Sequence, residues 1–158
     1  MSKAFTRESD DDNEGALPRP RAPLPQGVKN YITAEGAQRL REELAALLER
    51  AHSSEKPERK PLRDARMRQL QEIIGSLVVA EVPHERDVIR FDARVTVRRE
   101  STIETYRLVG IDEADLDRNE ISWLSPLAKV LLGKHAGDRI VFRSPSGMEE
   151  ITVLSVDY

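Results

Sequence analysis

The polar segment H-S-S-E-K-P-E-R-K-P holds acidic side chains whose type and spacing could serve a metal-dependent reaction. Glu55 and Glu58 lie three positions apart in it. Carboxylate oxygens are ligands that Mg²⁺ prefers, and a metal-activated water is a good nucleophile. However, Lys56, Arg59 and Lys60 flank the two acids, and cations beside a carboxylate site oppose the binding of a divalent metal. We therefore expect no metal site and no catalytic residue in this segment.

Other residue types that carry chemistry are scattered along the chain. His52, His84 and His135 lack the spacing of metal ligands. Ser144 and Ser146 flank a turn proline and have no evident base. The sequence has no cysteine and no glycine-rich phosphate loop. These features favour a binding protein without a cofactor or metal over an enzyme.

The same polar segment and its flanks are locally basic. From Arg50 to Arg68, seven Lys or Arg stand against three acidic residues. Such an excess is typical of contact with nucleic-acid phosphate or an acidic protein surface. The alternative is that these cations only keep helix faces solvated. The candidate contact residues are Lys56, Arg59, Lys60, Arg63 and Arg66.

Two amphipathic segments flank the basic region and are expected to position it. The first begins at Thr33, a suitable N-cap, and has an apolar seam at spacings of three and four: Ala37, Leu40, Leu44, Leu47, Ala51. The second starts after Pro61 and repeats the spacing: Met67, Leu70, Ile74, Leu77. Two helices joined by a short loop pack antiparallel. Residues 28–82 are therefore predicted to form a short antiparallel helical hairpin, a coiled coil.

The rest of the chain, residues 83–158, has the pattern of a small sheet domain. Apolar and polar residues alternate over residues 89–98, which predicts a strand with one solvated face. Further strands are predicted at residues 102–111, 120–123, 140–143 and 149–156. One helix follows Ser125, an N-cap, with Pro126 at its first position and Gly133 after its end. Trp123 precedes this helix and fits either the core or an exposed anchor. The fold class is therefore α+β, with a mostly antiparallel sheet.

Composition bounds what the whole protein can do. Of 158 residues, 34% are charged and 4% are aromatic, and the formal net charge of -3 argues against a polyanion binder overall. Residues 1–27 combine an acidic cluster with prolines and are predicted to be a disordered tail, although a competitor for a basic surface or metal is an alternative. No apolar run approaches a membrane span or a signal sequence, so the expected location is the cytoplasm.

Linked motifs run from about Val88 to Tyr158: Y-R-L-V-G-I-D-E-A-D, I-S-x-x-S-P-L-A, L-L-G-K-x-x-G-D and P-S-G-M. Their order and spacing resemble the C-terminal domain of bacterial Gre (GreA/GreB) transcript-cleavage factors. Y-I-T-A-E-G, from Tyr31 to Gly36, resembles the start of the family's coiled coil. The resemblance implies an FKBP-like sheet domain and RNA polymerase as partner, with contact to nucleic acid such as DNA in the transcription complex. It also implies that Leu124, Ser125 and Pro126 dock on the polymerase, although Leu124 stands where the family often has an acid.

The resemblance fails where the family's coiled coil carries its paired acids. That tip reads roughly D-x-x-E-N-A-D-Y in the family and helps to hold a catalytic Mg²⁺, whereas this chain has E-K-P-E-R-K-P. The seam from Ala37 to Ala51 spans only about 21 Å. We therefore expect a truncated coiled coil and a polymerase-binding transcription regulator that does not stimulate RNA cleavage. The alternatives are a cleavage factor with relocated acids, a protein like the short-hairpin regulator of nucleoside diphosphate kinase, and, from the fold alone, a prolyl isomerase.

Overall fold

The structure is a computed structural model, and it describes residues 21–52 and 56–158. The described chain divides into two compact units. The helical unit contains Leu40–Gly75, and the sheet unit contains Ala22–Arg39 and Ser76–Tyr158. Most of the predicted acidic tail, and Glu55 of the polar segment, lie outside the described residues. No helix within these residues is both long and apolar enough to cross a membrane.

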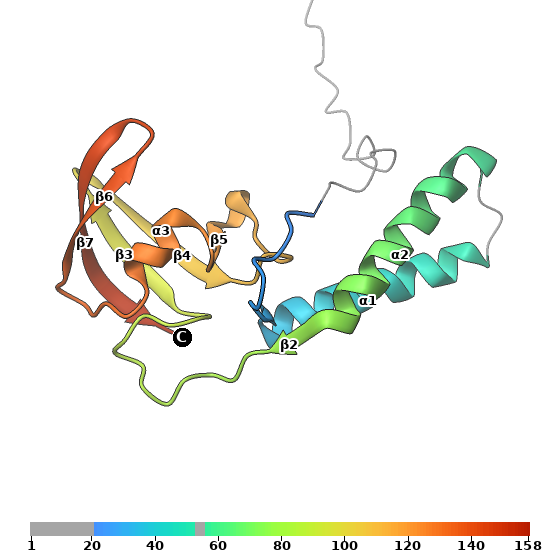
Figure 1. The fold of residues 1–158 in the computed structure, drawn as a ribbon, viewed down its shortest axis with the longest axis horizontal. Helices are drawn as coiled ribbons and strands as arrows, with labels where there is room; N and C mark the ends of the chain where they lie inside the picture. The colour runs from blue at the N-terminus through green and yellow to red at the C-terminus, as the bar shows by residue number, and fades with distance from the viewer. Residues whose placement is uncertain (1–20, 53–55) are drawn as a thin grey trace, which may run out of the picture. The chain divides into compact units, whose positions relative to one another are not determined.

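A five-stranded sheet forms the centre of the sheet unit (Figure 1). Its strand order is β5-β4-β3-β7-β6, and every neighbouring pair is antiparallel except β4 and β5. The bounds are β3 Arg94–Arg99, β4 Thr102–Val109, β5 Glu120–Ser122, β6 Arg139–Ser144 and β7 Gly147–Asp157. A short 3-10 turn, η3 (Leu116–Arg118), precedes β5. The predicted mixture of helix with a mostly antiparallel sheet is confirmed.

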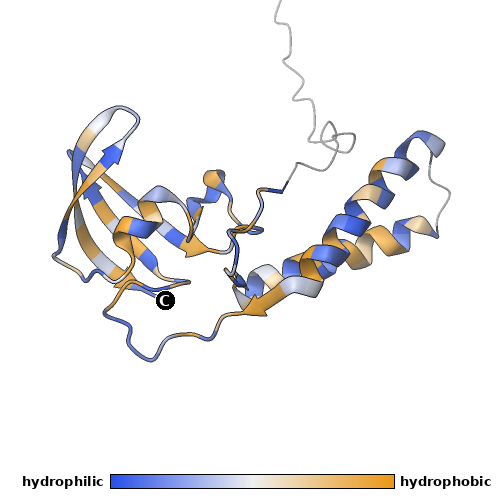
Figure 2. Cartoon of the chain, viewed as in Figure 1, coloured by the Kyte–Doolittle hydropathy of each residue, from blue (hydrophilic) through white to orange (hydrophobic). Residues whose placement is uncertain are grey.

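The core of the sheet unit lies on one face of this sheet. Strand β3 alternates polar and apolar residues, and its Val95 and Val97 are buried while Arg94 and Arg98 are exposed. Figure 2 shows polar and apolar residues mixed along the strands of the main sheet. The short helix α3, Pro126–Leu131, packs Ala128 and Leu131 into the core. The strand residues in the same cluster are Val95, Val97, Leu108, Ile121, Ile140, Ile151 and Val153. The opposite face of the sheet is more polar.

The predicted strand over residues 89–98 is wrong in its first half. Residues 91–92 form a turn in which Asp92 has a φ of 70°, and β3 begins only at Arg94. Ile89 pairs instead with the segment after α3, because its amide donates to the Lys134 carbonyl (2.8 Å) and its carbonyl accepts from the Gly133 amide (2.7 Å). Ile89 is still fully buried. The alternation therefore predicted the burial of Ile89 correctly, but it did not predict the segment with which Ile89 pairs.

A second, two-stranded sheet was not expected from the sequence. Strand β1, Asn30–Ile32, pairs in parallel with β2, Leu77–Val79. The Asn30 side-chain amide donates to Ser76 Oγ (3.1 Å) and to Asp112 Oδ2 (3.0 Å). These bonds tie β1 to the end of α2 and to the loop after β4. The two-stranded sheet thus brings together segments that are 46 or more residues apart in the chain. Leu77, predicted to belong to a helix seam, is therefore the first residue of a strand.

Two helices follow β1 in the chain and precede β2. Helix α1 spans Ala34–Ala51, and helix α2 spans Lys60–Ser76 after a 3-10 turn, η2, at Pro57–Arg59. Thr33 caps α1 as predicted, because its hydroxyl accepts from the Gly36 amide at 2.9 Å. In α2 the buried residues are Leu70 and Ile73, not Leu70 and Ile74. Packing of the two helices as a coiled coil, and domain boundaries at 28 and 83, stay predictions.

Candidate functional site

The loop Leu124–Pro126 is held tightly at the start of α3. The Ser125 hydroxyl accepts from the Ala128 amide at 3.2 Å, and the Ser125 amide donates to the Ser122 carbonyl at 2.9 Å. The Leu124 amide donates to Ser122 Oγ at 3.2 Å. Leu124 and Ser125 are half-buried, whereas Pro126 is exposed. The loop therefore has a backbone that is fixed by hydrogen bonds and side chains that are partly accessible.

Trp123, next to this loop, belongs to an aromatic cluster that sequence analysis missed. Its ring centroid lies 5.6 Å from that of Tyr31 and 6.2 Å from that of Phe91, in edge-to-face arrangements. Trp123 is half-buried, and its Nε1 has no hydrogen-bond partner among the described residues. The three rings line an open, mainly apolar groove of about 700 Å³ within the sheet unit. Trp123 is thus neither a fully buried core residue nor a protruding anchor.

The predicted basic residues differ in their exposure to solvent. Arg66 forms a bidentate pair with Glu43, at 2.7 and 2.8 Å, and thereby joins α2 to α1. The Arg63 side chain pairs with Asp64 at 2.7 Å and is only 11% exposed. Lys56, Arg59 and Lys60 are exposed. The exposed cations at the start of α2 are therefore better placed to contact a partner than Arg63 or Arg66.

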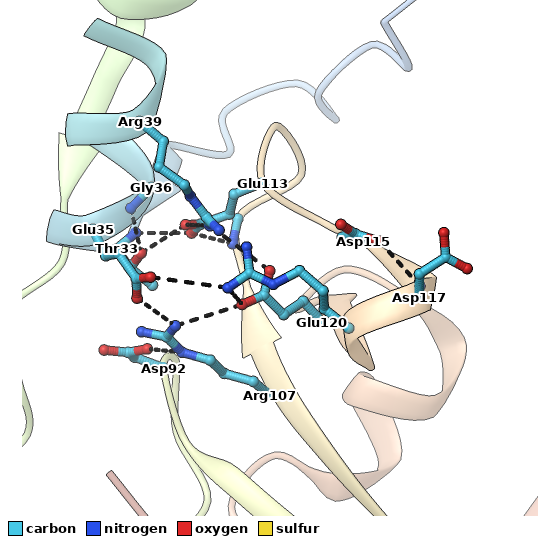
Figure 3. A network of polar contacts seen from close by, with 12 residues as sticks. Thr33, Glu35, Gly36, Arg39, Asp92, Arg107, Glu113, Asp115, Asp117 and Glu120 are labelled. Carbon is cyan, nitrogen blue, oxygen red and sulfur yellow. Dashed lines mark hydrogen bonds and ion pairs between the residues drawn. The ribbon is translucent and has the colours of Figure 1, made fainter. Parts of the chain in front are cut away.

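A buried carboxylate, Glu113, joins the first turn of α1 to the loop after β4 (Figure 3). Its side chain is 1% exposed. Oε1 accepts from the amides of Thr33 and Gly110, both at 2.8 Å, and Oε2 accepts from the Thr33 hydroxyl at 2.6 Å. Glycine is needed on both sides, since a Cβ at Gly36 would lie 1.7 Å from Glu113 Oε2 and one at Gly110 would lie 2.3 Å from the Tyr31 carbonyl oxygen. Glu113 is therefore a structural clamp.

Ion pairs extend from the clamp across the end of the sheet (Figure 3). Arg107 bonds Glu35 Oε2 and Asp92 Oδ1, each at 2.8 Å. The hydrogen bond and positive charge of Arg107 hold the pKa of Glu35 below its ordinary value. Glu120, almost fully buried, lies 3.6 Å from Arg107 Nη1 and 3.4 Å from Arg118 Nη2. Each of these acids forms an ion pair with an arginine, so the network stabilises the fold.

The sequence did not predict the Glu113 clamp, although the residues that form it belong to two motifs of the resemblance. Glu113 belongs to E-A-D, and Thr33 and Gly36 belong to Y-I-T-A-E-G, but their contact joins positions 80 residues apart. The one available signal was Gly36 inside the first turn of a helix, where glycine is disfavoured unless something approaches closely.

Within residues 21–52 and 56–158, no group of three or more His, Cys, Asp or Glu is arranged to hold a metal ion.

Comparisons with known proteins agree on one family. The model described as "Transcription elongation factor, GreA/GreB, C-term" matches residues 83–158. Transcription elongation factor GreB of Neisseria meningitidis serogroup B is 36% identical over 159 residues, covering 83% of this chain and 95% of that protein. Transcription elongation factor GreA of Magnetococcus marinus is 36% identical over 151 residues, covering 80% and 96%. Among solved structures, GreA/GreB from Nitrosomonas europaea matches with a TM-score of 0.42 and 25% identity, over 82% of this chain and 100% of that chain.

Proposed function

Because the chain belongs to the GreA/GreB family of transcription elongation factors, we propose that it binds RNA polymerase at the secondary channel and regulates elongation without stimulating RNA cleavage. An antiparallel coiled coil and an FKBP-like sheet domain are part of this proposal. The coiled coil would enter the channel, and the sheet domain would dock at its entrance.

The observation that carries the proposal is the chemistry of the segment between α1 and α2. Within the described residues 56–60, Glu58 is the one acid, and Lys56, Arg59 and Lys60 surround it. Glu58 lies in a 3-10 turn and is exposed. Stimulating cleavage requires carboxylates that hold a divalent ion and its water, and neighbouring cations oppose that binding. The second candidate acid, Glu55, lies outside the described residues.

The length of the helices supports a shortened arm. Helix α1 has 18 residues, which corresponds to about 27 Å at 1.5 Å per residue. The match to the Neisseria GreB extends over 159 aligned positions but uses only 83% of this chain's 158 residues. A part of the aligned GreB therefore has no counterpart here. A shorter arm would bring any carboxylate less deeply into the channel.

The Leu124–Pro126 loop is the proposed docking surface. Its backbone is fixed by the Ser125 cap, so a partner would not have to order it on binding. The test is the affinity of polymerase for the double variant Leu124→Asp, Pro126→Ala, with Leu116→Asp, Pro145→Ala as a matched control on other exposed turns. We expect the first variant to bind at least about tenfold more weakly, and the control to bind like the parent. Unchanged binding by a folded docking variant contradicts this surface.

The cleavage proposal is tested on backtracked transcription complexes. Purified protein is added alone and together with a cleavage factor, and transcript length is followed over time with Mg²⁺ present. We expect no shortening by this protein alone and slower cleavage when both are present, because occupancy of one entrance by one protein excludes the other. Mg²⁺-dependent shortening that disappears in a Glu55→Ala, Glu58→Ala variant would establish the alternative, a cleavage factor. Absence of any polymerase binding would instead favour a relative of the nucleoside diphosphate kinase regulator.

A further inference from the structure

The five-stranded sheet has one face that lies opposite the apolar core. At its β4–β5 end Arg107 bonds Glu35 in the first turn of α1, whereas over β3 and β6 this face is exposed. Helix α3 and the apolar cluster lie on the face that carries Val95, Val97 and Ile140. Side chains alternate along a strand, so the neighbouring residues point to the opposite face. This open face carries four exposed arginines from two strands: Arg94 and Arg98 on β3, and Arg139 and Arg143 on β6.

None of these four arginines is committed within the described residues. No described side chain forms an ion pair or hydrogen bond with any of them, in contrast to Arg99, Arg107 and Arg118 of the same unit. By register, Arg107 and Glu120 also lie on this face, and they pair with each other at 3.6 Å. Beside the four exposed arginines, the remaining acids of the strands on this face are Glu150, opposite Val141, and Asp157, opposite Arg94. Four cations against two acids leave this face positive, although the whole chain has a net charge of -3.

The strand register brings two of the arginines into one row. Arg98 pairs with Thr152, and Thr152 pairs with Arg139 on its other side. Two strand spacings separate the Cα atoms of Arg98 and Arg139 by about 10 Å. Exposed apolar side chains lie on the same face, namely Ile103, Val141 and Met148, which are 63%, 63% and 67% exposed. The face thus alternates free guanidinium groups with accessible apolar surface.

We propose that this open face, Arg94, Arg98, Arg139 and Arg143 with the apolar residues between them, binds single-stranded nucleic acid. The arginines contact phosphates, and unstacked bases pack on the guanidinium planes and on Ile103, Val141 and Met148. A duplex fits less well, because its bases are hidden and its major groove, about 12 Å wide, admits a helix or a two-stranded ribbon but not a five-stranded sheet.

The chemistry of the face predicts how the binding behaves. No aromatic residue of the described chain lies on it, so stacking on tyrosine or tryptophan contributes nothing and the binding is tolerant of sequence. Phosphate contacts dominate, and each contributes about -0.7 to the slope of log K against log salt concentration. The face is distinct from Lys56, Arg59 and Lys60 of the helical unit, and its test requires no polymerase.

The experiment is a fluorescence anisotropy titration of a labelled oligouridylate of about 12 nucleotides with the full chain. The test variant is Arg98→Gln, Arg139→Gln. The matched control is Lys129→Gln, Lys134→Gln, which removes the same charge from exposed residues within and just after α3, on the core side of the sheet. We expect the test variant to bind about tenfold more weakly with a salt slope reduced by about 1.4, and the control to lose less than about twofold.

Several outcomes overturn the proposal. Equal losses in both variants would mean that net charge alone attracts the oligonucleotide. Equal or tighter binding of a duplex, or equally effective competition by a poly-glutamate peptide of the same length, would mean that the face is not a single-strand site. Loss of all binding in Lys56→Gln, Lys60→Gln would place the site in the helical unit. Thermal unfolding checks that the test variant is folded, and Arg94→Gln, Arg143→Gln is the second pair if it is not.

Discussion

Glutamates occupy opposite environments in the two units. Glu113 of the sheet unit is 1% exposed and accepts three hydrogen bonds from Thr33 and Gly110. Glu58, between α1 and α2, is exposed and has cations as its neighbours along the chain. The same residue type therefore stabilises the fold at position 113 and is a solvated charge at position 58.

The comparison teaches that charge alone does not identify a functional acid in this protein. Glu113 accepts from backbone amides, and Glu43 and Glu149 each accept two hydrogen bonds from one arginine, so these carboxylates are committed to the chain's own groups. The exposed cations Lys56 and Lys60 and the arginines of the open sheet face are among the charged groups that a partner can reach. This arrangement is consistent with the proposal that the protein binds RNA polymerase without stimulating cleavage.

Replacement of the clamp is expected to have the largest effect. Glu113→Ala leaves the buried amides of Thr33 and Gly110 without an acceptor, and each unsatisfied buried group costs about 1–3 kcal/mol. We expect a loss of about 3 kcal/mol or more in the free energy of unfolding, measured by urea denaturation. Glu58→Ala is the control and should change it by less than about 0.5 kcal/mol. Similar small effects of both substitutions would show that the contrast between the two glutamates is wrong.

Two helical glycines sharpen the same contrast. Gly36→Ala would place a Cβ 1.7 Å from Glu113 Oε2, so the carboxylate must shift and its hydrogen bonds weaken. We expect a destabilisation of about 2 kcal/mol. Gly75→Ala in α2 has nothing within 4 Å of the added Cβ, so helix propensity should stabilise the protein by up to about 1 kcal/mol. Thermal unfolding of both variants should therefore show shifts of opposite sign, and shifts of the same sign would contradict the clamp.

The cap of α3 is expected to matter less. Ser125→Ala removes the hydroxyl that accepts from the Ala128 amide, at a cost of about 1 kcal/mol in the free energy of unfolding. Ser146→Ala, in the exposed hairpin turn, is the control and should be near neutral. Hydrogen exchange of the amides of α3 measures the local effect. Unchanged protection in Ser125→Ala would mean that packing of Ala128 and Leu131 alone holds the helix.

The smallest expected effect is a pH dependence from Glu35. The Arg107 hydrogen bond lowers the pKa of Glu35 in the folded protein from the ordinary value of 4.5. The folded state therefore binds its proton less readily than the unfolded state, and the associated stability is present above about pH 4.5 and is lost as pH falls below it. Stability measured from pH 6 down to pH 3 should fall less steeply in Glu35→Gln than in the parent. Identical slopes would indicate that this exposed pair contributes nothing.

Local patterns were sufficient for the elements whose signals lie within a few residues. Ser125, Pro126 and Gly133 mark both ends of α3, and the structure has the cap and a Gly133 φ of 78°. Thr33 likewise marks the start of α1. The five strands of the main sheet were predicted from local composition and turn residues, with alternation as the signal only for residues 89–98. The candidate docking loop was named from the resemblance to the Gre family, and the basic segment from its local excess of Lys and Arg. Their roles in binding stay predictions.

What the sequence by itself determined about this protein is its family and its mixture of helix and sheet. Only the tertiary structure decided that Asn30–Ile32 pairs with Leu77–Val79, that residues 91–92 turn, and that Glu113 clamps Thr33. The physical reason is range. Caps and alternation are set by neighbours a few positions away, whereas the β1–β2 region and the Glu113 clamp join segments 46 to 80 residues apart. No local pattern specifies which buried acceptor meets which donor.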